Sequence, residues 1–551
     1  MYAVIAGRLA QLSLTARRIA ELGAAIGRAF TLAVLLQAGQ DGEANTIRAL
    51  DELWQKRVVR EQSANVYDFT HDKLREVAYA EISAPQRRLL HHRIAQSFES
   101  LHADQLDPIS AQIAAHYEQA GMVEQAIPYY ERAGTVAANV YANDEAISLL
   151  KRGLTLLSQS SPSQKRDAQE LTFLLALARL YRITKGWAST DTEQVANRAW
   201  LLAKKAGTDA QQIQTLFLLQ SVHIVVPRFD KVLEVEHEMR RTLETSGSLP
   251  PPFTKIQYIG AMLHHQGRFA EGWQMFEEML AAPDEKTIRE LQATQGVNYV
   301  AMGYAWSSHA IWCLGYPQKA YASCQEGVRL AHEFPHPFSQ ALTLAYFALL
   351  QELRADAHTF RVHAEETFAY TLEHHVTYYH AWASILAQFA RAWQEPNPGN
   401  LALLRDAIRA FTETGAHLRM PYYLSLLTRV LYKAGQLSEA LAALEEAFTE
   451  SRQNAEYWWD AELYRLQGEL IWAQGAEADG VEAAFLRSIE IAQSQQAKSL
   501  ELRAALSLAR LWRATGRSSA AKQLLVPLYG WFTEGFDTPD LQAAQALIAQ
   551  L

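Results

Sequence analysis

The sequence predicts a mainly α-helical protein, in which a long array of stacked helix pairs follows a small module of helices and a two-stranded wing. Three observations favour this fold. Amphipathic helical segments follow one another from about residue 105 onward. Small and large side chains recur in them at fixed distances from turn glycines. The chain of 551 residues is too long for one ordinary core, whereas a repeat array grows without one.

The N-terminal module, residues 1–100, has its own order of elements. Helical spacing marks 15–26 and 43–56, and β-like runs mark "RVVRE" (57–61) and "NVYDF" (65–69). The next segment, "THDKLREVAYAEI", reads as a helix with Thr70 as its N-cap and Asp72 in its first turn, where a carboxylate suits the helix dipole. This order predicts a winged-helix module and a connecting helix.

The array beyond residue 105 shows one repeated register. A glycine ends a helix, a small residue follows five positions later, a large one four after that, and another residue three further on. The matching sets are Gly121, Ala126, Tyr130 and Ala133; Gly267, Gly272, Phe276 and Met279; Gly315, Ala320, Cys324 and Gly327; Gly435, Ala440, Leu444 and Ala447; and Gly516, Ala521, Leu525 and Leu528. Such small-against-large packing is typical of tetratricopeptide (TPR) helix pairs.

The spacing of the repeats leaves a second architecture open. The glycine intervals are 48 residues from 267 to 315, 40 from 435 to 475 and 41 from 475 to 516, against about 34 in a standard TPR. Armadillo or HEAT pairs share the longer period and are the alternative. Loops rich in Pro, Gly and Ser divide the array into pairs over 105–245, 246–400 and 401–551.

Composition narrows the classes of function. The net charge of −9 argues against nonspecific nucleic-acid binding, and the second helix of the module carries too many acids for DNA recognition. Cys313 and Cys324 form neither a disulfide framework nor a metal-ligand set, which favours a reducing, cytoplasmic setting. We find no export signal and no apolar run long enough to cross a membrane. The histidine pairs 91–92, 264–265 and 374–375 lack metal-ligand spacing and are interpreted as structural.

The TPR register also predicts which side chains line the inner face of the array. Counting back from the last three turn glycines gives a basic and aromatic set: Arg429, Tyr432, Lys433, Arg465, Trp472, Arg503, Arg510 and Arg513. Arginines beside aromatic rings suit carboxylates, phosphates or peptides. This set therefore predicts a ligand groove for a protein or peptide, acidic ones included, or for a small-molecule effector. The alternative is internal pairing, for example of Arg465 with Glu462 or Glu469. Met302, His309 and Trp312 predict a second, more apolar pocket.

Several stretches resemble one protein family. They include "GAAIGRAF" (23–30), "YDFTHDKLREVAY" (67–79), "QQAKSLELRAALSLARLWRATGR" (495–517) and "LLVPLYGWFTEGFDTPDL" (524–541). They are similar to the winged-helix and TPR region of bacterial STAND-type ATPase regulators, which join this region to adenylate/guanylate cyclase or DNA-binding domains. The resemblance implies that His71, supported by Asp72, is a sensor that contacts the β-phosphate of ADP. Thr70 replaces the methionine that the family carries before this histidine.

The phosphate cradle of such an ATPase is missing from the chain. No GxxxxGK followed by Ser or Thr occurs, and "GAAIGRAF" has the wrong spacing and no lysine. We therefore expect no enzymatic activity and no cofactor in this chain, with ATP or ADP present only if an ATPase core is supplied in cis or in trans. The expected function is a sensor and protein-interaction arm of a STAND-type regulator. The alternatives are a free-standing TPR scaffold, or a fragment of an ATPase or nucleotide cyclase whose catalytic domains lie upstream.

Overall fold

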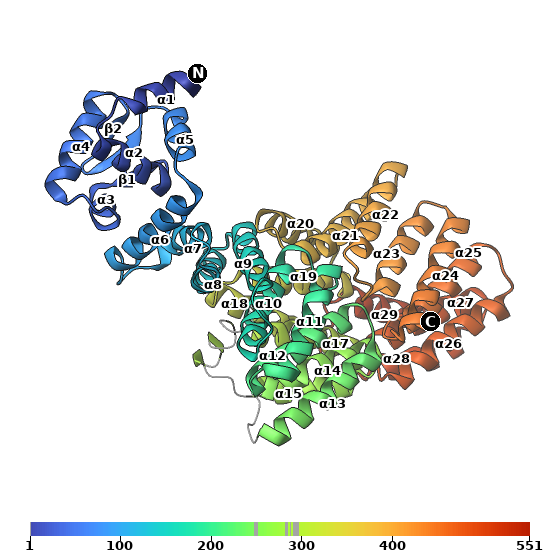
Figure 1. Cartoon of the computed structure of the whole chain (residues 1–551). Helices are drawn as coiled ribbons and strands as arrows, with labels where there is room; N and C mark the ends of the chain where they lie inside the picture. Colours follow the sequence, from blue (N-terminus) through green and yellow to red (C-terminus); the bar gives the residue numbers. More distant parts are fainter. Residues whose placement is uncertain (1, 247–251, 282–284, 287, 290–291, 293–296) are drawn as a thin grey trace. The chain divides into compact units, whose positions relative to one another are not determined.

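The computed structural model describes residues 2–246, 252–281, 285–286, 288–289, 292 and 297–551. The expectations made for residues 247–251 and the masked positions between 282 and 296 lie outside this set. Two compact units are distinguished, residues 1–180 and residues 181–551, and each is described by itself (Figure 1).

The N-terminal unit begins with the predicted mixture of helices and short strands. Its elements are α1 (Tyr2–Ala10), α2 (Leu14–Ile26), β1 (Ala29–Thr31), α3 (Leu32–Ala38), α4 (Glu43–Gln55), β2 (Val59–Ser63), β3 (Val66–Phe69), α5 (Asp72–Ala80), α6 (Ala84–Leu101), a 3-10 turn (Asp107–Ile109), α7 (Ser110–Gln119), α8 (Val123–Asn139), α9 (Asn143–Leu157) and α10 (Gln164–Thr184), which runs on into the second unit.

The strands form one antiparallel sheet in the order β1-β3-β2. The hairpin β2–β3 lies where the two β-like runs predicted it, with Val59 opposite Phe69 and an irregularity between Glu61 and Ser63. The strand β1 was not predicted; it pairs with the free edge of β3 and sets Phe30 opposite Tyr67. Helix α3 was not predicted either. The helices and hairpin agree with the expected order of elements, and the assignment of this module to the winged-helix class stays a prediction.

The C-terminal unit consists of α-helices throughout its described residues, and Figure 1 shows them stacked side by side in antiparallel pairs. They are α11 (Thr190–Ala206), α12 (Asp209–Val225), α13 (Phe229–Ser246), α14 (Pro252–His265), α15 (Phe269–Leu280), α17 (Tyr299–Cys313), α18 (Pro317–Glu333), α19 (Pro337–Leu353), α20 (Ala357–Glu373), α21 (Thr377–Gln394), α22 (Pro398–Glu413), α23 (Met420–Lys433), α24 (Leu437–Asn454), α25 (Asp460–Ala473), α26 (Ala478–Ser494), α27 (Lys498–Ala514), α28 (Ser518–Tyr529) and α29 (Pro539–Gln550).

The predicted small-against-large register is confirmed. Ala126, Ala320, Ala440 and Ala521 are fully buried where two helices of a pair meet. The turn glycines adopt the left-handed conformation that suits glycine, for example φ +79° at Gly516. The fold is therefore a TPR-like helical-repeat array, the predicted class.

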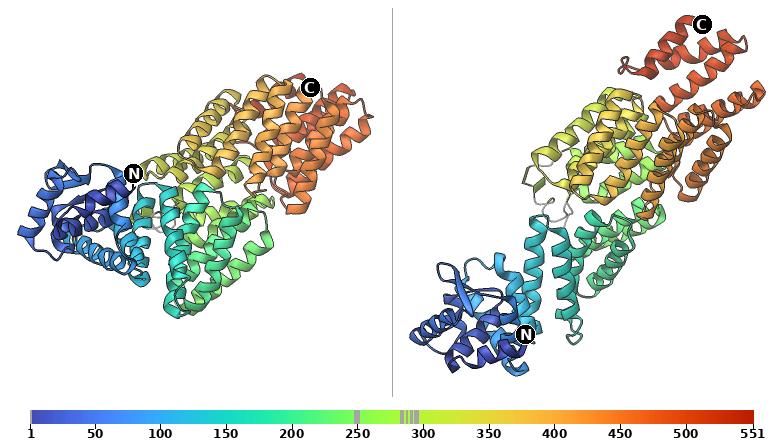
Figure 2. Two further views of the ribbon diagram at one scale, coloured as in Figure 1. Left: turned by 45° about the horizontal axis from the view of Figure 1, so that its top comes forward. Right: turned by 90° about the horizontal axis from the view of Figure 1, so that it is seen from above.

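One helix of each pair contacts the corresponding helix of the next pair, so that α12, α14, α17, α19, α21, α23, α25 and α27 form a continuous inner row. The row curves, so that helices early in the row come into contact with helices late in the row, as α17 does with α27. We call α12, α14 and α17, with the end of α10, the first turn, and α21, α23, α25 and α27 the second turn. Figure 2 shows the green helices of the first turn against the orange helices of the second.

The two turns are joined by a regular ladder of hydrogen bonds. Each acceptor is a backbone carbonyl in the last turn of α10, α12, α14 or α17, and each donor lies at or just before the start of α21, α23, α25 or α27. The Thr184 carbonyl accepts from the Thr377 hydroxyl, and the Val225 carbonyl accepts from the backbone N–H groups of His417 and Leu418. The His265 carbonyl accepts from the backbone N–H of Trp458, and the Trp312 carbonyl accepts from the Ser499 hydroxyl. The partners lie 187 to 193 residues apart in the sequence. The last carbonyls of an α-helix lack partners within their own helix. Each hydrogen bond of the ladder therefore joins the negative C-terminal end of a first-turn helix dipole to the positive N-terminal end of a second-turn helix dipole.

Candidate functional site

The ladder encloses a buried polar cluster, which we call the seam: His264, His265, Arg419, Glu456 and Trp458. The Glu456 carboxylate is fully buried and accepts from the backbone N–H of Arg419 at 2.8 Å and from Nε1 of Trp458 at 2.9 Å. Nδ1 of His265 lies 3.0 Å from the same oxygen. Burial, only partly offset by the Arg419 charge, raises the pKa of Glu456 to about 8. The seam joins loops to helix α14 and was not visible in the sequence.

The Arg419 side chain is 3% exposed and is held by aromatic rings. Its guanidinium lies 4.8 Å from the centroid of the Tyr346 ring and 4.7 Å from that of Trp382, and it donates to the Tyr346 hydroxyl. Both ring nitrogens of His264 are buried without a hydrogen-bond partner among the described residues. Burial lowers the pKa of His264 and His265 well below the usual range, so both imidazoles are neutral at pH 7.

Three of the arginines expected in a ligand groove have acidic partners inside the array. Nη1 of Arg429 lies 2.5 Å from Glu352 of α19, which also accepts from the Tyr422 hydroxyl. Arg503 pairs with Asp540 at 2.8 Å and donates to the Leu353 carbonyl.

Arg465 shows the internal pairing that the sequence left open. It lies 2.7 Å from Glu462 and 3.2 Å from Glu469 on its own helix. Burial would raise the pKa of Glu462, but the charge and hydrogen bonds of Arg465 outweigh it and hold that pKa below its usual value. The charges of Arg429, Arg465 and Arg503 are thus neutralised by ion pairs within the array.

The remaining members of the predicted groove lie near the other ends of the second-turn helices. Tyr432 is 37% exposed, Lys433, Arg510 and Arg513 are exposed, and Trp472 is half-buried. The Lys433 ammonium lies 4.6 Å from the centroid of the Trp393 ring and donates to the Trp393 carbonyl. The structure thus divides the predicted set into half-buried arginines paired with acids and a more exposed aromatic and basic group.

The predicted second pocket is filled by the core. Met302, His309 and Trp312 are at most 2% exposed. Nε2 of His309 lies 3.1 Å from the Tyr346 carbonyl, and burial lowers the pKa of His309 to about 3. The Arg503 guanidinium lies 4.9 Å from the centroid of the Trp312 ring. These three side chains stabilise the array and form no open site.

His71 lies at an open pocket of about 530 Å³ in the N-terminal unit. Its walls also carry Arg8, Trp54, Arg57 and Arg60, together with Gln55, Val59 and Thr70. Arg60 pairs with Asp68, and Arg8 donates to the Lys56 carbonyl at 3.0 Å, whereas no carboxylate lines the pocket among the described residues. Three guanidinium groups, an imidazole and an exposed indole are suited to a phosphate-bearing ligand.

The start of α5 differs from the expected one. The N-cap is His71, without a side-chain capping bond, and the Thr70 hydroxyl instead donates to the Arg57 carbonyl at 2.8 Å. Asp72 is exposed in the first turn, as predicted. Thr70 therefore ties the start of α5 to the residues before the hairpin, and the His71 side chain makes no capping bond to the helix.

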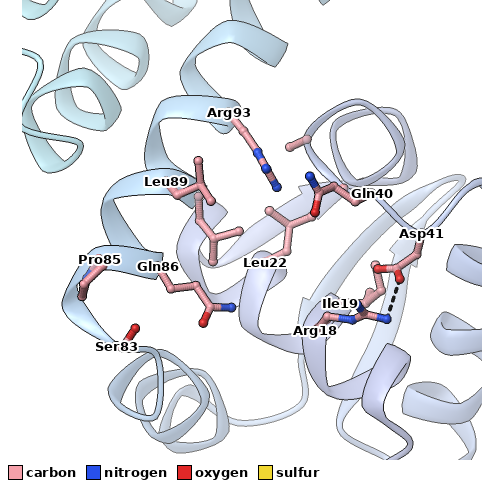
Figure 3. Close-up of a pocket in the computed structure, with 13 residues that line it drawn as sticks. Arg18, Ile19, Leu22, Gln40, Asp41, Ser83, Pro85, Gln86, Leu89 and Arg93 are labelled. Carbon is pink, nitrogen blue, oxygen red and sulfur yellow. Dashed lines mark ion pairs between the residues drawn. The ribbon is translucent and has the colours of Figure 1, made fainter.

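A second pocket of the N-terminal unit, of about 430 Å³, lies between α2, the α3–α4 turn and α6 (Figure 3). Leu22 and Leu89 form apolar walls, and Arg18 is tied to Asp41 at 2.7 Å. With its amide oxygen turned toward α6, Gln40 accepts from Arg93 at 2.7 Å. The pocket brings together α2 and α6, which lie more than 50 residues apart in the sequence.

The described residues contain no group of three or more His, Cys, Asp or Glu side chains placed to hold a metal ion. Both cysteines are free and buried. Across the described part of the chain, no helix has the length and apolar character required to cross a bilayer.

No protein-family model matches the sequence. An uncharacterized protein of Rhizobium meliloti is 25% identical over 524 residues, which cover 93% of this chain and 50% of the relative. The chain thus spans about half the length of that relative.

Two solved structures are similar to this chain at low sequence identity and with TM-scores below 0.5. A STAND protein with a tetratricopeptide repeat sensor from Pyrococcus horikoshii is 11% identical, with a TM-score of 0.47, over 84% of this chain and 66% of that chain. A Rap protein in complex with competence and sporulation factor is 11% identical, with a TM-score of 0.43, over 77% of this chain and 99% of that chain. The class that the fold defines is that of TPR-like helical-repeat proteins.

Proposed function

We propose that this chain is a non-enzymatic sensor and protein-interaction arm of a STAND-type signalling regulator. The observation that carries the proposal is the position of His71, the sensor residue implied by the resemblance, at the mouth of a pocket walled by Arg8, Arg57, Arg60 and Trp54. The helical-repeat array supplies the second part of the proposal, because repeat arrays bind partners over extended surfaces.

The pocket chemistry suits the nucleotide that an ATPase core would bring in cis or in trans. Arg8 and Arg57 offer cationic donors for phosphate oxygens, His71 adds a ring nitrogen, and the 61% exposed indole of Trp54 offers a stacking face. Asp72 follows His71 in the first turn of α5, and the resemblance gives it the role of supporting residue.

In this proposal a partner protein, a peptide or a small effector binds the array and shifts its packing against the nucleotide-bound core. Such a ligand acts as a switch only if it binds one state more tightly than the other. The pocket keeps the core in its ADP-bound state until that shift occurs.

The nucleotide part is tested by calorimetric titration of the full chain with ADP, AMP and inorganic phosphate. We expect ADP to bind more tightly than AMP, because the pocket offers more than one cation for the second phosphate. The double variant R8Q/R57Q should weaken ADP binding by about tenfold or more, since each lost charge-assisted hydrogen bond is worth roughly 1.5–3 kcal/mol.

The matched control is Arg48→Gln, which removes an exposed arginine of α4 that binds only its neighbours Ala44 and Asn45. Equal ADP affinity in R8Q/R57Q and wild type, or equal losses in both variants, would refute a nucleotide contact at this pocket. Wild-type protein that binds no ADP, either alone or with an ATPase core added in trans, would also refute it.

The relative from Rhizobium meliloti, of which this chain spans 50%, supports the proposal that related arms are joined to further domains. A free-standing scaffold remains the rival, and the two differ in the pocket. A scaffold has no use for ADP, so the titration above distinguishes them.

A further inference from the structure

The inner helices end in two different surroundings, and the register allows a position-by-position comparison. Three residues before the turn glycine, α14 has His264 and α17 has Trp312, which are 3% and 2% exposed. The second turn of the array covers both of these helix ends through the ladder.

The same register position on α23, α25 and α27 holds Tyr432, Trp472 and Arg513. The later helix α29 (Pro539–Gln550) reaches the end of α27, where Arg513 donates to Gln550, whereas Tyr432 of α23 is 37% exposed. We call Trp393, Tyr432, Lys433, Trp472, Arg510 and Arg513 the open row. It runs over four neighbouring helices, because α21, α23, α25 and α27 contact one another in order.

The cations of the open row lack acidic partners among the described residues. Lys433 donates to the Trp393 carbonyl, and Arg513 donates to the amide oxygen of Gln550. No ion pair links Arg510 to any described residue. Glu469 of α25 is already bound by Arg465 and Ser507. The deeper arginines Arg429, Arg465 and Arg503 of these helices pair with acids, whereas no ion pair is formed by the cations of the open row among the described residues.

The chain itself shows how such a helix end is covered. The loop Glu456–Trp458 covers the end of α14. The backbone N–H of Trp458 donates to the His265 carbonyl at 3.1 Å, and Oε1 of Glu456 lies 3.0 Å from Nδ1 of His265. A short segment with an acid and an aromatic residue thus satisfies both the orphan carbonyl and the ring nitrogen of the histidine at this helix end.

We infer that the open row binds an acidic segment of a partner protein that carries an aromatic residue, in the manner in which Glu456 and Trp458 cover α14. The inference rests on the proposed function and names the surface that this arm uses. The carboxylates of the partner meet Lys433, Arg510 and Arg513, and its aromatic ring packs against Tyr432 and Trp472.

The test measures fluorescence anisotropy of a labelled Glu-Glu-Trp-Glu-Glu peptide with the full chain. Its Gln-Gln-Trp-Gln-Gln counterpart and an oligothymidine of similar charge are the comparison probes. We expect the acidic peptide to bind, the neutral one not to bind, and the variant K433Q/R510Q/R513Q to bind about tenfold more weakly or less.

The matched control is R409Q/R487Q/K522Q, which removes three exposed cations from outer helices and changes the net charge equally. Equal losses in both triple variants, oligothymidine binding as tight as that of the acidic peptide, or no peptide binding by wild type would each overturn the inference. Both triple variants should bind ADP with the affinity of the wild type. A loss of peptide binding is therefore distinguished from a loss of nucleotide binding at the His71 pocket. Unchanged thermal melting of both variants excludes misfolding as the cause.

Discussion

The seam of the C-terminal unit and the His71 pocket of the N-terminal unit both gather arginine and histidine side chains, and the two regions treat them in opposite ways. In the seam, Arg419 is 3% exposed and lies between aromatic rings, with Glu456 beside it. At the pocket, Arg8, Arg57 and His71 are exposed and no carboxylate lines the wall. Buried cations require partners from the protein itself, whereas an exposed cluster keeps its charge for a ligand. The seam should therefore control stability and the pocket should control binding.

The largest effect is expected for Glu456→Ala. The substitution leaves the buried backbone N–H of Arg419, the Trp458 indole and the His265 ring without their partner. We expect a loss of about 3–5 kcal/mol in the free energy of unfolding, because each buried polar group left unsatisfied costs about 1–3 kcal/mol. Urea denaturation followed by tryptophan fluorescence reports on this unit, because twelve of the 13 tryptophans lie in residues 181–551.

Glu446→Ala is the matched control for this measurement. Glu446 lies on α24, close to Glu456 in the sequence, and is exposed. Its removal should change the free energy of unfolding by less than about 0.5 kcal/mol. A Glu456→Ala variant as stable as this control would show that the seam does not hold the two turns together.

The second prediction concerns pH. Burial lowers the pKa of His309 to about 3 and those of His264 and His265 well below 6.5. The unfolded chain takes up a proton at each of them below about pH 6.5, and the folded chain does not. Stability therefore falls as the pH drops below 6.5, by up to about 1.4 kcal/mol per pH unit for each histidine.

The contribution of Glu456 to the pH dependence of stability has the opposite sign. Its pKa is raised to about 8, so between about pH 4.3 and pH 8 the folded chain keeps a proton that the unfolded chain has lost. This contribution to stability declines as the pH rises toward 8. Three histidines outweigh one carboxyl group in acid, so unfolding in urea at pH 5.5, 7 and 8 should show a maximum near neutrality. In Glu456→Gln the decline above pH 7 should disappear, and a decline that persists would assign it to another group.

The sequence predicted the helix pairs because their packing is local. Ala440 and Ala521 lie within a few residues of the turn glycines that mark each pair. The pair α19–α20 carries no such glycine, and Ala355 adopts the positive φ of +59° in its turn. The strand β1 has three residues, too few for a recognisable alternation.

The sequence predicted part of each candidate site, and it missed the contacts between residues that lie far apart in the chain. The register placed Arg429 and Arg503 on the inner row but gave no sign that Glu352 and Asp540 would meet them. The ladder joins positions about 190 residues apart, a distance at which no periodicity identifies partners. His71 was singled out by resemblance, whereas Arg8, Trp54 and Arg57 reach its pocket only through the fold.

The third prediction concerns a contact at the edge of the array. The Glu534 carboxylate accepts from the backbone N–H groups of Gln318 and Lys319, at 2.9 and 3.0 Å, in the first turn of α18. Glu534→Ala removes this cap and should cost about 1 kcal/mol. Glu534→Gln keeps one acceptor and should cost less, as measured by the same urea transition. Equal stability of the alanine variant and wild type would show that solvent caps α18 equally well.

The smallest effect is expected at the pocket, where the variants His71→Ala and Arg57→Gln test the other side of the comparison. The His71 side chain makes no capping bond to α5, and Arg57 is held through its backbone carbonyl by Thr70. Each change should alter the unfolding free energy by less than about 0.5 kcal/mol, as measured by thermal melting of the N-terminal unit. A loss of 2 kcal/mol or more in either variant would mean that these side chains support the module itself, and the pocket would then be a structural feature like the seam.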